Sequence, residues 1–353
     1  MTPSRAEPIF FGPDERPLFG WLHRSTARTP ARIGLVICNP FGYEAVCAHR
    51  TIRHFAMAAA TAGIPAIRFD YDGTGDSAGD DFDPDRLQSW IRSIHDAIEV
   101  LKAQTNVQHV CLLGLRLGAT LASLASCERS DVIGVAAIAP VINVRTYMRE
   151  LRALALAGQR SEPPEWATLI PDLQESAGFA LTAATRAALG SVDLMKQPRQ
   201  ASRMLVIDRD DMPPNSAWVE HLRTAGAEVE HVRAPGFTEM MLDSHEALVP
   251  TAMIASTLGW LGTFADTPFA APTSNGPTRL RAQPDAEFDI LSANGKSARV
   301  RESALFPHSS QTLFGVVTEP VNQADRRAPL ILLLNSGAVH HIGPNRLHVL
   351  LAR

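Results

Sequence analysis

Apolar runs alternate with helix-like patterns along the first 265 residues of the chain. The runs have the length and β-branched content of buried strands, and the stretches between them repeat apolar residues at helical spacing. Because parallel strands need crossover connections, this alternation predicts a mostly parallel, doubly wound α/β sheet with helices on both faces. The predicted strands are 33–38, 64–69, 109–114, 132–140, 204–208 and 229–235, and the main predicted helices are 50–62, 86–104, 215–225 and 246–261.

One stretch interrupts this alternation. Residues from about 143 to 200 are rich in Ala, Leu and Arg and contain no convincing strand. We interpret them as a helical insertion that forms a cap over the C-terminal edge of the sheet. Residues 1–265 then form one domain that includes this cap.

A different composition follows this domain. Residues 266–284 are rich in Pro, Ser, Thr and Ala and are typical of a linker. Beyond them, Leu-Phe-Gly at 313–315 repeats Leu-Phe-Gly at 18–20, and each motif leads through an apolar run to an Asn followed eleven positions later by an Arg (Asn39 to Arg50, Asn335 to Arg346).

This repeat predicts a second copy of the domain that begins near residue 285 and reaches Arg353 inside its first helix. Since residues 285–353 cannot close a sheet alone, we expect them to be the truncated start of that copy in a tandem protein. The alternative is a C-terminal tail with chance similarity.

Composition and charge exclude several functions. The chain is 45% hydrophobic, and its 33 basic and 37 acidic residues give a net charge of −4 without a basic stripe, which argues against nucleic acid. The N-terminus lacks a signal-peptide pattern, and no run of eighteen apolar residues predicts a membrane span, so we expect a cytoplasmic protein. The four cysteines have no CxxC spacing and no nucleotide-binding motif is present, so neither metal nor cofactor is expected.

The strands are followed by recognisable motifs. FDYDGTGDS follows one strand and GLRLGA follows the next, an order that resembles the α/β-hydrolase superfamily and, within it, the serine-aminopeptidase-like or monoacylglycerol-lipase-like branch. GLRLGA, DRDDMPP and the tandem arrangement are also similar to bacterial hydrolase-like proteins associated with exosortase and exopolysaccharide gene clusters. The resemblance implies an α/β-hydrolase fold that hydrolyses small ester, thioester or amide bonds.

The catalytic positions depart from that family. In active relatives, a strained strand–turn–helix bearing Gly-x-Ser-x-Gly exposes the nucleophile. Here the turn is Gly114-Leu115-Arg116-Leu117-Gly118, and a guanidinium cannot attack a carbonyl. Asp211 occupies the acid position and Glu239 the histidine position. Serine-triad catalysis in residues 1–265 is therefore not expected, and whether the chain is an enzyme stays uncertain.

Arg116 has two interpretations. We expect an ionic cluster in which its guanidinium lies between the carboxylates of Asp211 and Glu239. The alternative is an anion site, in which Arg116 and the helix N-terminus hold a carboxylate or phosphate.

Other residues offer a pocket and two unusual alternatives. Asn39, Phe41 and Gly42 stand where relatives have their oxyanion loop, and Leu117 follows the nucleophile position. Cys47 near His49 is an alternative nucleophile and base, and His245 is an alternative histidine.

Three functions follow: a hydrolase whose work lies in the second copy, a non-catalytic binding or scaffolding domain that supports that copy, and an unorthodox enzyme. The small-molecule ligand is unknown. A protein partner would be the second domain or another copy in a homodimer.

Overall fold

The structure of the chain is a computed structural model. It describes residues 6–27, 32–158, 173–176, 178–197, 201–264, 282–291, 297–307, 313–321, 329–335, 337 and 339–353. The predicted linker falls mostly on residues 265–281, which lie outside the described residues.

A central sheet organises the first domain. In the described chain it has the strand order β1-β2-β4-β3-β5-β6-β9-β10, with β1 and β2 antiparallel and the strands from β4 to β10 parallel. The predicted α/β fold with a mostly parallel sheet is confirmed, although β1 and β2 are not among the predicted strands. The strands are β1 (Ala6–Phe11), β2 (Leu18–His23), β3 (Ile33–Cys38), β4 (Ala66–Phe69), β5 (His109–Leu115), β6 (Val132–Ile138), β9 (Arg203–Arg209) and β10 (Glu228–Ala234).

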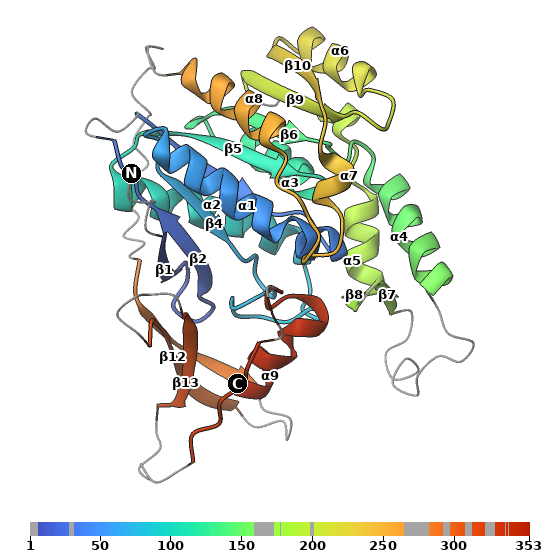
Figure 1. Cartoon of the computed structure of the whole chain (residues 1–353). Coiled ribbons are helices and arrows are strands. Elements are labelled where there is room, and N and C mark those ends of the chain that lie inside the picture. Colours follow the sequence, from blue (N-terminus) through green and yellow to red (C-terminus); the bar gives the residue numbers. More distant parts are fainter. Residues whose placement is uncertain are drawn as a thin grey trace.

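Helices cover both faces of this sheet because successive strand residues point to opposite sides. Val36 and Leu112 belong to the buried cluster on the side of α2, α3 and α6, whereas Leu35 and Leu113 belong to the cluster on the side of α1 and α8. Figure 1 shows α1 and α8 on the near face. The helices are α1 (Tyr43–Thr61), α2 (Arg86–Thr105), α3 (Leu117–Cys127), α6 (Ser216–Thr224), α7 (Phe237–Met240) and α8 (Thr251–Gly262).

Two helices begin at positions other than those predicted. α1 starts at Tyr43 rather than near residue 50, directly after Gly42, whose φ of 68° turns the chain into the helix. α8 starts at Thr251 rather than at 246, because Pro250 disfavours helical backbone in the residue before it.

The cap lies between β6 and β9. It contains α4 (Val144–Gly158), α5 (Ala183–Gly190) and the 3-10 helix η2 (Leu194–Lys196). Its short antiparallel hairpin, β7 (Gln174–Ser176) and β8 (Phe179–Leu181), differs from the prediction of helices without strands. Three-residue strands are too short to show an alternating pattern in the sequence.

The described residues between 282 and 353 form a smaller unit, the second unit, beside the β1–β2 hairpin (Figure 1). An antiparallel sheet of β11 (Asp285–Leu291), β12 (Ser297–Leu305) and β13 (Gly315–Pro320) precedes the 3-10 helix η3 (Gly343–Arg346) and α9 (Leu347–Ala352). Gln283 joins it to the first domain through backbone hydrogen bonds of 2.8 and 2.9 Å with Phe10.

The two Leu-Phe-Gly motifs lie in similar hairpins. The glycine of the first motif, Gly20, pairs with Ile9, and Gly315 of the second pairs with Leu305. A phenylalanine follows each partner and meets the motif phenylalanine edge-on. The ring centroids are 5.2 Å apart for Phe10 and Phe19, and 5.7 Å apart for Phe306 and Phe314.

The apolar run after the second motif has a different environment from its counterpart. Val36 in β3 is fully buried, but the corresponding Leu332 is 76% exposed. The predicted repeat implies that this run is a strand equivalent to β3, whereas the structure shows residues 329–335 outside any strand. β3 is buried between β4 and β5, and the described residues provide no equivalent neighbours for 329–335.

None of the helices in the described part of the chain is long and apolar enough to cross a membrane.

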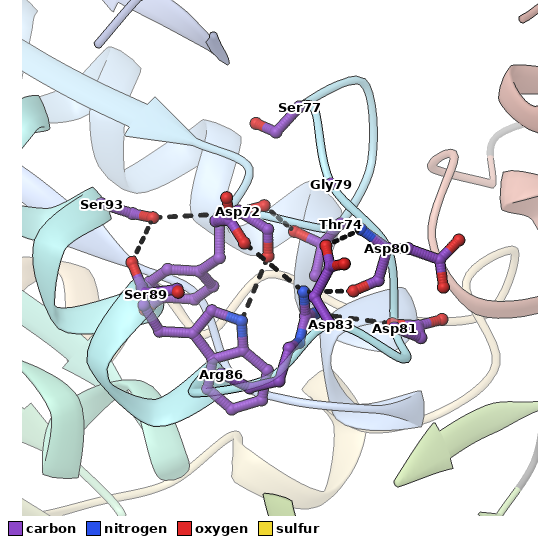
Figure 2. Close-up of polar contacts among 12 residues, drawn as sticks. Asp72, Thr74, Ser77, Gly79, Asp80, Asp81, Asp83, Arg86, Ser89 and Ser93 are labelled. Carbon is purple, nitrogen blue, oxygen red and sulfur yellow. Dashed lines mark hydrogen bonds and ion pairs between the residues drawn. The ribbon is translucent and has the colours of Figure 1, made fainter. Parts of the chain in front are cut away.

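The Gly-rich turn, residues 70–83, is held from inside by charged groups. Figure 2 shows carboxylates of this turn gathered around Arg86. The buried Arg86 guanidinium lies 3.6 Å from Asp72 and 3.5 Å from Asp81 and donates a 2.7 Å hydrogen bond to the carbonyl of Asp80. Arg16 also pairs with Asp72. These contacts fix the backbone that the second unit touches.

Replacing Arg86 should therefore destabilise the fold. Arg86→Met takes one of two guanidinium partners from the buried carboxylate of Asp72 and removes the ion pair of the partly buried Asp81, and we expect a loss of about 3 kcal/mol in the free energy of unfolding. Urea unfolding measures it. The control Arg92→Met, on an exposed part of the same helix where Arg92 bonds to Ser89, should change stability by less than about 0.5 kcal/mol. Equal losses in both variants would contradict this account.

Candidate functional site

The turn between β5 and α3 has the geometry of a nucleophile elbow. Arg116 has φ 53° and ψ −121°, a strained conformation for a residue with a side chain. A Cβ at Gly118 would lie 2.2 Å from the carbonyl oxygen of Cys38, and one at Gly114 would lie 2.3 Å from the Cα of Ala119. Both glycines are therefore needed for this turn.

The Arg116 side chain pairs with a carboxylate that sequence analysis did not assign to it. Its Nε donates a 2.7 Å hydrogen bond to Oε1 of Glu44, and its Nη2 lies 3.7 Å from Glu150. Its guanidinium also stacks over the Tyr147 ring at 5.3 Å, while the Tyr147 hydroxyl donates to Glu44 at 2.9 Å. Burial acts to lower the pKa of Arg116, but the interactions with Glu44, Tyr147 and Glu150 together raise it.

The predicted cluster of Arg116 with Asp211 and Glu239 is wrong. Within the described residues, Arg116 forms its ion pairs with Glu44 and Glu150. Asp211 bonds instead to Arg209 at 2.6 Å, which lowers the pKa of its carboxyl to about 2, and Glu239 is exposed on α7. Glu44 lies on the first turn of α1, within reach of the elbow, so it satisfies the guanidinium locally. It also opposes the anion-site alternative by occupying that guanidinium.

The acid and histidine positions of the family still adjoin each other. Asp211 lies 3.3 Å from the hydroxyl of Thr238, next to Glu239. The buried carboxylate on this side of the sheet is Asp208, which accepts hydrogen bonds from Asn215 at 2.6 and 2.8 Å and lies 2.6 Å from His231. Asp208 thus holds a loop together.

The two unusual alternatives are not assembled. Burial raises the pKa of the Cys47 thiol to about 11, which disfavours the reactive thiolate. His49 stacks on His340, with ring centroids 4.4 Å apart. His245 is 73% exposed and lies 3.8 Å from Glu246.

A small pocket of about 50 Å³ lies beside the elbow. The residues assigned to the oxyanion loop and its neighbour line it: Asn39, Phe41, Gly42 and Leu117. Asn39 donates a 2.6 Å hydrogen bond to the carbonyl of Phe69, which anchors this loop to the sheet. Trp90, Leu121 and Phe179 add apolar walls.

The second unit also lines this pocket, which the sequence motifs do not predict. Its residues His340, Ile342, Gly343 and Arg346 line the wall opposite the sheet. The repeat of Asn335 to Arg346 marks the segment, but a repeat gives no information about which surface it contacts.

The second unit docks on the Gly-rich turn through directional contacts. Arg346 is buried and donates to the carbonyls of Gly75, Ser77 and Gly79 at 3.1, 3.0 and 2.8 Å. His340 lies 2.6 Å from Asp70, His341 lies 3.1 Å from Asp76, and Arg353 donates to the carbonyls of Asp76 and Ser77. A guanidinium bound by several carbonyls fixes orientation as well as distance.

Across the described residues, no group of three or more His, Cys, Asp or Glu side chains is placed to hold a metal ion.

Comparison with known proteins agrees with the fold. Residues 46–198 match the family described as serine aminopeptidase, S33. The chain is similar to Est1E from Butyrivibrio proteoclasticus, with TM-score 0.51 and 17% identity over 72% of this chain and 99% of that one. It is also similar to the esterase PF2001 from Pyrococcus furiosus, with TM-score 0.50 and 13% identity over 74% and 90%. A search of curated protein sequences finds no match.

These findings establish an α/β-hydrolase fold. At such low identities the solved structures support the fold alone. The function of this chain must be argued from its own residues.

Removing the charge of Glu44 tests the role of its pair with Arg116. Glu44→Gln leaves the largely buried guanidinium without its main partner, and we expect a loss of about 2 kcal/mol in the free energy of unfolding, measured by urea denaturation. The matched control is Glu150→Gln, because Glu150 is 58% exposed and 3.7 Å away, and it should lose less than about 1 kcal/mol. The larger loss in the Glu150 variant would contradict the assignment.

The His341–Asp76 pair should make docking depend on pH. The hydrogen bond to Asp76 raises the pKa of His341 above 6.5, against the effect of burial, and Asp70 adds to the rise. A raised histidine pKa adds stability that is complete below its ordinary value and lost as the pH rises through the raised value. Asp76, whose pKa is lowered, faces His341, His340 and Arg353.

We therefore expect His341→Asn to lose more stability relative to the wild type at about pH 5.5 than at about pH 8.5. Urea unfolding of both proteins at both pH values measures this loss. Because the loss is the stability of the wild type minus that of the variant, the titration of the other histidines, which both proteins share, cancels. An equal loss at both values would show that the pair contributes no charge interaction.

Proposed function

We propose that residues 1–265 are a non-catalytic α/β-hydrolase domain that supports a second copy of the same fold, which begins near residue 285. The observation that carries this proposal is the environment of Arg116. The nucleophile position of the elbow holds a guanidinium paired with Glu44, and neither Asp211 nor Glu239 pairs with it. An arginine in this state can neither attack a carbonyl nor accept a proton.

The second unit supplies the support for a tandem arrangement. Its β12–β13 hairpin repeats the pairing and the aromatic packing of β1 and β2, and its Arg346 binds the Gly-rich turn of the first domain. Hydrolysis of small ester, thioester or amide bonds, which the family resemblance implies, would then belong to an elbow in the second copy.

The test is hydrolysis of p-nitrophenyl acetate and butyrate by the chain of residues 1–353. We expect turnover no higher than the background without protein, and Arg116→Ser should not create activity because no histidine stands at the position of Glu239. Turnover that disappears in Asp211→Ala or Cys47→Ala would overturn the proposal. Circular dichroism of each variant confirms that it is folded.

A further inference from the structure

Two segments meet over the pocket beside the elbow and cover part of it. One is the cap hairpin, which contributes Phe179, and the other is the segment Val339–Arg346 of the second unit. The pocket has a volume of about 50 Å³ and is partly open to solvent. Both segments narrow it, because each contributes side chains to its lining.

The two segments interlock at a pair of glycines. Gly343 has φ +52°, and a Cβ there would lie 2.6 Å from the Phe179 ring. Gly178 has φ +82°, and a Cβ there would lie 1.9 Å from the ring of Pro344. Each segment therefore places a ring against the bare backbone of the other, and movement of one must affect the other.

Polar contacts hold the base of the second segment, while its tip is apolar. Arg346 donates to three carbonyls of the Gly-rich turn, and His340 bonds to Asp70 and stacks on His49. Ile342 packs with Val46 and Phe179 above the pocket. This arrangement of a fixed base and an apolar tip suits a segment that covers the apolar part of a pocket whose lining also includes Asp70 and Asp81.

We propose that residues 339–346 are a lid that shuts this pocket and links its opening to the docking of the second copy. The walls formed by Phe41, Trp90 and Leu121 suit an uncharged aryl or short acyl group, which binds when the lid and the cap hairpin lift. A ligand needs the lid raised, whereas docking of the second copy needs the lid in place. Ligand binding therefore weakens lid docking, and lid docking weakens ligand binding by the same factor. The proposal deepens, and rests on, the proposed partnership between the copies.

The test compares two alanine variants of the full chain by hydrogen exchange. In Gly343→Ala the new methyl collides with Phe179, so the amides of β8 and of residues 41–45 should exchange at least about tenfold faster than in the wild type. This factor corresponds to a loss of about 1.4 kcal/mol in the free energy that protects these amides. The matched control is Gly337→Ala. Gly337 also has a positive φ of +68°, but a Cβ there meets no atom within 4 Å, so its exchange at these amides should match the wild type.

A second variant and a ligand probe keep the test decisive. Gly178→Ala attacks the same interlock from the cap side and should give the same faster exchange, which covers the case in which Gly343→Ala unfolds. Benzyl alcohol, titrated by NMR, should bind the lid-opened variant at least about tenfold more tightly than the wild type.

Exchange that is unchanged in both lid variants, or equally faster in Gly337→Ala, would overturn the lid. So would benzyl alcohol binding that is the same in all proteins. None of these measurements depends on ester turnover, so a failure of the lid and a failure of the proposed function are distinguishable.

Discussion

The close approach of backbone to backbone at the elbow constrains much of the first domain. Gly118 packs so tightly against the carbonyls at the end of β3 that α3 has a single position relative to the sheet. Arg116 keeps a positive φ at a cost of about 1–3 kcal/mol, which the surrounding packing must offset. The turn that exposes a nucleophile in active relatives is thus retained with a residue that cannot be one. A backbone on which so many contacts depend changes less readily than one side chain.

Placing a guanidinium at this point imposes a second requirement. A largely buried charge needs a partner, and Glu44 provides it while also accepting the hydroxyl of Tyr147. One carboxylate therefore ties together the start of α1, the elbow and the cap helix α4. In a catalytic member of the fold the same space must admit substrate. In this chain the side chains of Arg116, Glu44 and Tyr147 occupy that space and stabilise each other.

Sequence patterns predicted the parts of the fold that depend on local periodicity. The buried strands β3, β5 and β6 are short apolar runs, and the glycines around Arg116 identify the elbow directly. β1 and β2 escaped prediction because Pro8 interrupts the first strand and Gly20 the second. The pairing of Arg116 with Glu44 escaped too, because it joins residues 72 positions apart. Several carboxylates in the sequence are chemically equivalent candidates for the partner of Arg116, and the fold determines which of them lies next to it.

The contact between Phe19 and Phe314 has a consequence for how the two units associate. These residues hold the same position in the two Leu-Phe-Gly motifs, and their rings lie 6.0 Å apart. A residue that touches its own counterpart is what a two-fold symmetric dimer has on its axis. Between separate molecules, an interface of this kind would form or dissociate with protein concentration. Within one chain, the effective concentration is set by the connection and reaches the millimolar range for short linkers. A few aromatic and arginine contacts are then sufficient to hold the two units together, whatever the concentration of the protein.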